Sequence, residues 1–288
     1  METLAQSVVS GVLTGSLYAM IAIGLTIVFG VMRIINMAHG EMVMLGMFGA
    51  YWSHEMWHLD PFLSILLWTP VMFAFGMFVH RFLLKKIIPS GELNTLLYTA
   101  GLSLLLANLA LFFWAGDYRN INLDYAMTPV RPFGISISVQ LAIAFAIAIA
   151  LTGGLYLLMT RTDIGRAIRA TAQNPDSAAL MGVNVVRIDM ITFGIGTALA
   201  AAAGVLLVPS LYVYPTVGEI LSVKCFVIVV LGGLGSVPGA IAGGLLLGLV
   251  ESLGAVYVSV AFKDTIGFVL FLLVLLFRPA GLFGVGRA

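Results

Sequence analysis

The sequence has little charge: only 9% of its 288 residues are Asp, Glu, Lys or Arg, against roughly 25% in an ordinary soluble domain. Its 14 basic and 13 acidic residues could not cover a soluble surface of this size, and the net charge of +1 gives no basic surface for nucleic acid. The single cysteine, Cys225, excludes an intrachain disulfide. By contrast, 61% of the residues are hydrophobic and the mean hydropathy is +1.09. We therefore expect lipid to be the solvent for most of the chain.

Long apolar runs divide the chain into membrane segments. A helical span needs about 20 mostly apolar residues, and the runs that meet this without difficulty are 7–31, 62–80, 93–114, 139–158 and 189–211. The weaker segments are 34–53, which has polar residues in its first turns, 223–234, 240–253 and about 256–277. The pattern predicts an all-α, polytopic integral membrane protein with about eight to ten transmembrane segments, some short or broken. All of them belong to a single transmembrane domain, 1–288.

Basic residues predict the orientation of these segments, because cytoplasmic connections carry an excess of Lys and Arg. Such residues gather between 81 and 86, between 161 and 187, and in the tail after 277. With these regions inside, nine crossings place the N-terminus outside and the C-terminus in the cytoplasm. The basic residues left on the outer side are Arg119, Arg131, Lys224 and Lys263.

The most informative polar stretch is 161–187. Residues 164–173 can form a short amphipathic helix, Asn174 can cap a second helix with Pro175 at its first position, and Gly182 can end it. Small side chains make a face that another protein can approach closely, so the stretch predicts a docking region for a cytoplasmic partner. An ordinary connector is the alternative. The candidate docking residues are Gly165, Arg166, Ala167, Arg169, Ala170, Asn174, Ala178 and Gly182.

A second group of polar residues lies between apolar runs at membrane depth. Buried polar groups there are costly and usually face a cavity or each other, so this group is a candidate for the translocation pathway or its gate. The alternative is a packing and capping cluster at a helix junction. One His and one Glu do not make a metal site. The residues are Arg33, Asn36, His39, Gly40 and Glu41.

The glycine-rich run at 232–239, GGLGSVPG, resembles a dinucleotide-binding turn. Its flanks are of membrane type, however, and no βαβ unit or suitably spaced acidic residue accompanies it. We expect a break between two half-helices, which at membrane depth lines a cavity or packs on protein. The residues of this break are Gly232, Gly233, Gly235, Pro238 and Gly239. The chain also lacks a G-K-[ST] phosphate loop and a G-x-S-x-G nucleophile elbow.

Three stretches, 11–51, 163–185 and 229–240, resemble the permeases of bacterial ABC importers for branched-chain amino acids. The resemblance covers nearly the whole chain, includes the RPAGLFG tail at 278–284, and is closest to the H-type subunit. It implies half of a transmembrane pair, completed by an M-type permease in a heterodimer. It also implies two cytoplasmic ATPase subunits that dock on 163–182, and a periplasmic substrate-binding protein. On this reading the chain is no enzyme and holds no cofactor, because ATP and Mg²⁺ bind to the partner ATPases.

The resemblance places the chain in the bacterial cytoplasmic (inner) membrane, in contact with lipid. Three other functions stay open. Permeases for urea or short-chain amides are similar in sequence. A secondary transporter or channel would be expected to have paired carboxylates within its spans, where Glu251 is nearly alone. An intramembrane enzyme would need a Ser/His or metal constellation.

Overall fold

A computed structural model describes residues 2–123, 125, 130 and 136–284. Over these residues the chain is helical apart from turns, loops and two isolated bridges. The long helices are α1 (Glu2–Met32), α2 (His39–Trp57), α3 (Pro61–Val79), α5 (Glu92–Trp114), α6 (Val139–Arg161), α9 (Val185–Leu207), α10 (Val217–Gly232), α11 (Val237–Tyr257) and α12 (Lys263–Phe277). The short helices are α4 (Lys85–Ile87), α7 (Asp163–Gln173) and α8 (Pro175–Leu180), with a π-helix at His80–Leu84 and 3₁₀ turns at Ile88–Ser90 and Val260–Phe262.

Each expected membrane segment corresponds to one long helix, which confirms the all-α membrane fold. Within the described residues, seven helical stretches are long and apolar enough to cross a membrane. The long helices outside that set are α2, whose sequence is interrupted by polar residues, and α10. The 16 residues of α10 span about 24 Å, less than the ~30 Å of a hydrocarbon core.

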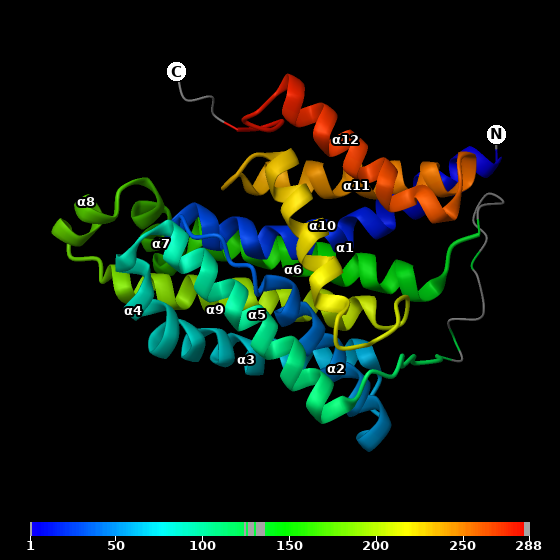
Figure 1. Ribbon diagram of the computed structural model, residues 1–288, viewed down its shortest axis with the longest axis horizontal. Helices are drawn as coiled ribbons and strands as arrows, with labels where there is room; N and C mark the ends of the chain where they lie inside the picture. Colours follow the sequence, from blue (N-terminus) through cyan, green and yellow to red (C-terminus); the bar gives the residue numbers. More distant parts are fainter. Residues whose placement is uncertain (1, 124, 126–129, 131–135, 285–288) are drawn as a thin grey trace.

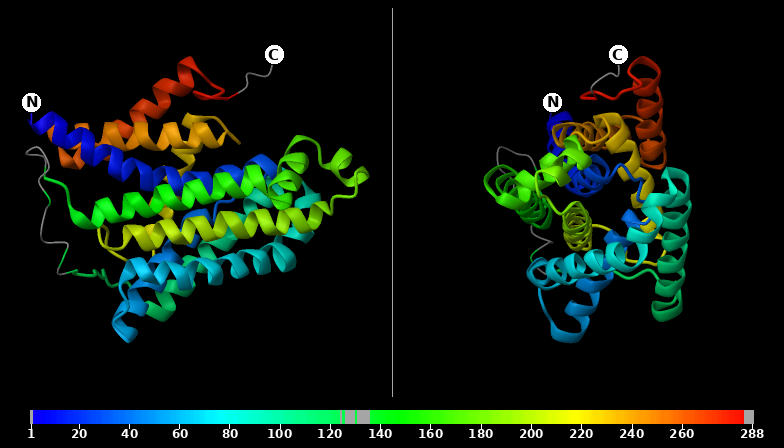
Figure 2. Two further views of the ribbon diagram at one scale, coloured as in Figure 1. Left: turned by 180° about the vertical axis from the view of Figure 1, so that it is seen from behind. Right: turned by 90° about the vertical axis from the view of Figure 1, so that its left-hand side faces the viewer.

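The centre of the bundle is built from α1, α2 and α9. α1 packs along α11 and α9, and α9 also packs on α2 and α3. The outer helices α5, α6 and α12 bury few of their side chains, and the end-on view of Figure 2 shows them at the edge of the bundle. Figure 1 shows α4, α7 and α8 at one end of the bundle and the N-terminus at the opposite end.

The connection between α1 and α2 corrects the prediction of a span at 34–53. α2 begins only at His39, and residues 33–38 are a non-helical break. Arg33 has a φ of 53°, and the chain then folds back until His39 lies beside Ile21 and Gly24 of α1. Because Ile21 is in the middle of the apolar run of α1, the break leads into the middle of the membrane layer.

The break is possible because other helices supply hydrogen bonds to its backbone. Thr99 of α5 accepts a hydrogen bond from the Met37 N–H (3.2 Å), and its hydroxyl proton is shared between the Ile35 carbonyl (3.1 Å) and the Leu96 carbonyl of its own helix (3.0 Å). Ser222 of α10 accepts from the Gly40 N–H (2.9 Å) and donates to the Met37 carbonyl (3.3 Å). Buried backbone groups without a partner are costly in lipid, so these two side chains fix where the chain can leave the helix.

α10 begins at the same depth, directly against the start of α2. A Cβ atom on Gly40 would lie 2.0 Å from the Gly218 carbonyl oxygen, and one on Gly218 would lie 2.3 Å from Oε2 of Glu41. A side chain at position 40 would push the helices apart, because it meets backbone of α10, whereas one at position 218 would displace the Glu41 carboxylate. Two helix N-termini therefore meet near mid-membrane.

We predict that Thr99→Val and Ser222→Ala each destabilise the protein by about 1–3 kcal/mol, because each leaves buried backbone groups of the break without a partner. Thermal unfolding of the purified protein measures this. Thr192→Val is the matched control, since the buried Thr192 hydroxyl donates only to the Ile188 carbonyl of its own helix. Equal stability of Thr99→Val and Thr192→Val would contradict the prediction.

Candidate functional site

The structure brings together four of the five residues predicted to shape the pathway. Asn36, His39, Gly40 and Glu41 are buried inside this chain, whereas Arg33 lies on the surface. Asn36 precedes α2 instead of lying in its first turn, because the chain is not yet helical there. None of the four buried residues faces lipid.

Asn36 and His39 have the contacts of a packing and capping cluster. The Asn36 side chain accepts a hydrogen bond from the Ala38 N–H (3.2 Å), which tightens the turn before α2. Nε2 of His39 lies 3.0 Å from the Ile21 carbonyl oxygen and ties α2 to α1. These two side chains hold the break in place from within.

Glu41 differs from them, because only one of its oxygens has a hydrogen-bond partner in the described part of the chain. Oε1 accepts from the Ser103 hydroxyl of α5 (3.2 Å), while Oε2 is buried without a partner and points toward Gly218. Glu219 follows on the exposed side of α10. Both glutamates lie in first turns, where the positive end of the helix dipole stabilises a carboxylate.

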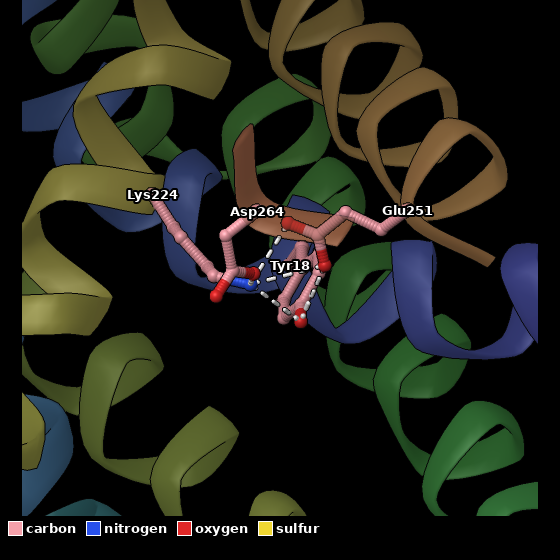
Figure 3. Close-up of polar contacts among 4 residues, drawn as sticks. All are labelled: Tyr18, Lys224, Glu251 and Asp264. Carbon is pink, nitrogen blue, oxygen red and sulfur yellow. Dashed lines mark hydrogen bonds and ion pairs between the residues drawn. The ribbon is translucent and has the colours of Figure 1, made fainter. Parts of the chain in front are cut away.

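A second polar cluster joins four helices (Figure 3). Lys224 of α10 donates to both carboxylate oxygens of Glu251 on α11 (2.8 and 3.0 Å) and to Asp264 on α12 (2.8 Å). It also lies 3.2 Å from the Tyr18 hydroxyl on α1, which donates to Glu251 (3.1 Å). Lys224 and Glu251 are about nine-tenths buried, and Asp264 is half exposed.

This cluster corrects two expectations. Lys224 lies within α10 and is largely buried among other helices instead of in a connection between spans. Glu251 is not alone among the charges of the spans, because α10 and α11 lie side by side and α12 returns along them. A signal for the cluster was present in the sequence. Residues 223–277 are largely apolar and hold four charged residues, Lys224, Glu251, Lys263 and Asp264. Charges in such a stretch are expected to pair, since an isolated charge in a membrane is costly.

The glycine-rich run forms the predicted break. α10 ends at Gly232, Gly233 has a φ of 103°, and Ser236 caps α11 by accepting from the Gly239 N–H (3.1 Å). Pro238 occupies the first turn of α11, where its missing N–H costs nothing. The expectation of two half-helices is wrong for α11, which is long enough to span.

The RPAGLFG tail packs on this turn. The N–H groups of Leu282 and Phe283 donate to the carbonyls of Leu231 (2.8 Å) and Gly232 (3.0 Å). A Cβ on Gly233 would lie 2.5 Å from the Gly284 nitrogen. Two motifs that the sequence keeps apart by about 40 residues are thus one structural unit.

The predicted helix pair at 164–182 is present with its caps. α7 follows Thr162, whose hydroxyl accepts from the Gly165 N–H (3.0 Å), and α8 follows Asn174, whose side chain accepts from the Ser177 N–H (2.9 Å). Gly182 has a φ of 86°, the left-handed conformation that suits glycine just after a helix.

The prediction of an exposed face of small residues is only partly correct. Ala170 and Arg169 are exposed, but Ala167 is half-buried, and Ala178 and Gly165 are buried because they pack inside this chain. Arg166 is engaged by Asp163 one turn earlier. Two apolar residues that no sequence pattern marked, Leu180 and Met181, are 88% and 85% exposed at the tip of α8.

A family model described as "Branched-chain amino acid transport system / permease component" matches residues 7–276. The chain belongs to this family. It is 35% identical to the high-affinity branched-chain amino acid transport system permease protein BraD of Pseudomonas aeruginosa, over 97% of this chain and 95% of that protein. The corresponding permease protein LivH of Escherichia coli K12 is 34% identical, with the same coverage.

The chain is thus a transport permease that crosses the membrane several times, as the apolar helices indicate. A part of it is also similar to the fructose import permease protein FrcC of Rhizobium meliloti, with 34% identity over 35% of this chain and 29% of that protein. The architecture is therefore shared, in part, with a permease named for a sugar.

We predict that Lys224→Met destabilises the permease by about 3–5 kcal/mol, because it leaves Glu251 buried without a counter-charge. The double variant Lys224→Met/Glu251→Gln should regain most of that loss, since its remaining carboxylate, Asp264, reaches solvent. The stability of both variants is measured by unfolding in detergent, with circular dichroism as the readout. A double variant as unstable as the single one would contradict this account.

Proposed function

We propose that this chain is the permease subunit of an ATP-driven importer and forms half of the pathway for branched-chain or related hydrophobic amino acids. The observation that carries the proposal is the similarity to BraD and LivH along nearly the whole chain. The second half of the pathway is an M-type permease in a heterodimer. A periplasmic binding protein delivers the substrate across the bacterial cytoplasmic membrane.

The outer surface of α10 is the part of this chain that fits a pathway for such substrates. Glu219 is exposed near mid-membrane, and Ile220 and Val223 beside it are each 49% exposed. A charge facing lipid at that depth costs several kcal/mol, so this surface faces water or the second permease. Aliphatic side chains beside a carboxylate suit a zwitterionic amino acid with an apolar side chain.

ATP hydrolysis takes place in two separate cytoplasmic subunits that bind to α7 and α8. The caps at Thr162 and Asn174 make this helix pair rigid. Its exposed apolar tip, Leu180 and Met181, can bind in an apolar groove of an ATPase subunit. α8 leads through Gly182 directly into α9, so that a force on the tip reaches the core of the bundle. This end of the molecule is then cytoplasmic and the N-terminus periplasmic.

The function is tested by reconstituting the chain with the M-type permease, the ATPases and the binding protein in vesicles. We expect ATP-dependent uptake of radiolabelled leucine and no uptake of urea. Uptake of urea in preference to leucine would assign the alternative substrate class. Leucine uptake that needs no ATPase subunit would replace the importer by a secondary transporter.

We predict that the ATPase subunits no longer co-purify with the double variant Leu180→Ser/Met181→Ser, because the tip of α8 can no longer bury apolar surface against them. Each large side chain that stays exposed forfeits about 1.5–3 kcal/mol of burial. Leu104→Ser is the control, since it removes another exposed leucine, 61% exposed, from α5 at membrane depth. Full ATPase retention by the double variant would show that the tip of α8 is only a connector.

We also predict that Glu219→Leu lowers leucine uptake about tenfold or more at an unchanged level of protein in the membrane. The loss of one charged interaction along the pathway, worth about 1.5–3 kcal/mol, accounts for this size. Glu92→Leu, in the exposed first turn of α5, is the matched control. If Glu219 faced lipid, the leucine variant would transport as well as the wild type.

A further inference from the structure

A basic pocket of about 520 Å³ lies between the end of α3 and the start of α9. Its polar lining consists of His80, Arg81, Lys85, Asn184 and Arg187. It lies at the end of the bundle that carries α4, α7 and α8 (Figure 1). None of the residues discussed as pathway or docking residues lines it.

The local backbone makes this cavity. α3 passes into the π-helix at His80–Leu84, a wider turn that occurs frequently at functional sites. Opposite it, Asn184 caps α9 by accepting from the Arg187 N–H (3.1 Å), which fixes the start of that helix at the rim. The positive end of the α9 dipole therefore adds to the charge of the pocket.

The charges of the pocket are unbalanced. Arg81, Lys85 and Arg187 contribute three cations, and none of the lining residues is acidic. The ion pairs in the described part of the chain involve Arg166 and Lys224 only, so the three cations have no carboxylate partner there. An anion in the pocket would relieve their mutual repulsion.

His80 supplies an independent sign that a ligand belongs there. Its side chain is 98% buried, yet neither ring nitrogen has a hydrogen-bond partner among the described residues. An imidazole always has at least one N–H or one acceptor nitrogen to satisfy, and a buried group left unpaired is costly. His80 is one of the residues that line the pocket.

We propose that the basic pocket binds a phosphate group, and that its source is the headgroup of an anionic phospholipid. Two guanidinium forks and an ammonium group match the several oxygens of a phosphate better than the two of a carboxylate. The cavity has room for more than a bare phosphate ion. It lies between α3 and α9, and Phe78 and Phe82, which flank the lining residues His80 and Arg81 in sequence, are more than half exposed, as lipid-facing residues would be.

The test is a lipid titration of the purified full-length chain in detergent, followed by thermal unfolding. The ligands are dihexanoyl phosphatidylglycerol, dihexanoyl phosphatidylcholine and inorganic phosphate. Phosphatidylglycerol should raise Tm in a saturable way, and Arg81→Gln or Arg187→Gln should raise its apparent Kd about tenfold each. Lys86→Gln, which removes the neighbouring cation outside the pocket, should bind like the wild type.

The other outcomes either identify a different source of the phosphate group or contradict the proposed phosphate site. Protection by inorganic phosphate that Arg187→Gln abolishes, with no added effect of the lipid, would keep the phosphate chemistry and overturn the lipid source. Equal shifts by the two lipids, or equal binding by all variants, would overturn the proposal. Since the assay involves neither ATPase nor uptake, its failure is separate from any failure of the proposed transport function.

Discussion

The chain leaves helical geometry at residues 33–38 inside a membrane protein, where water cannot serve the exposed backbone groups. The rest of the structure depends on how that need is met. Thr99 brings α5 to the break, and Ser222 brings α10. Gly40 and Gly218 let the two helix starts touch at backbone distance. A larger residue in place of Gly40 would separate the Ser222 hydroxyl from the Gly40 N–H group that donates to it.

The start and the length of α10 follow from this constraint. It must begin at the depth of the break, so it is short, and its polar residues lie on different sides of one helix. Ser222 points to the break, while Lys224, two residues on and thus about 200° around the helix, points to Glu251 and Asp264. One short helix therefore links both polar clusters of the membrane layer.

Much of this fold could be predicted because its signals are local. Apolar runs of sufficient length mark the spans, and Asn174, Pro175 and Gly182 mark helix ends that depend only on neighbouring residues. The break could not be placed, since its partners Thr99 and Ser222 are about 60 and 180 residues away and resemble any other hydroxyl in a span. Ala178 was misplaced for the same reason: alanine suits a docking face and a packed interior equally well.

The packing of the core limits how such a permease can move. A Cβ on Gly46 would lie 2.3 Å from the Ala201 carbonyl, and one on Gly248 would lie 2.4 Å from the Gly15 Cα, so α2 on α9 and α11 on α1 are in backbone contact. Close-packed interfaces of this kind switch between discrete arrangements and do not slide continuously. A force that enters through α8 meets α9 first, and α9 is locked to α1, α2 and α3. The bundle core must then move as one body, so in the proposed pair of permeases the moving boundary lies outside this core, between the two subunits.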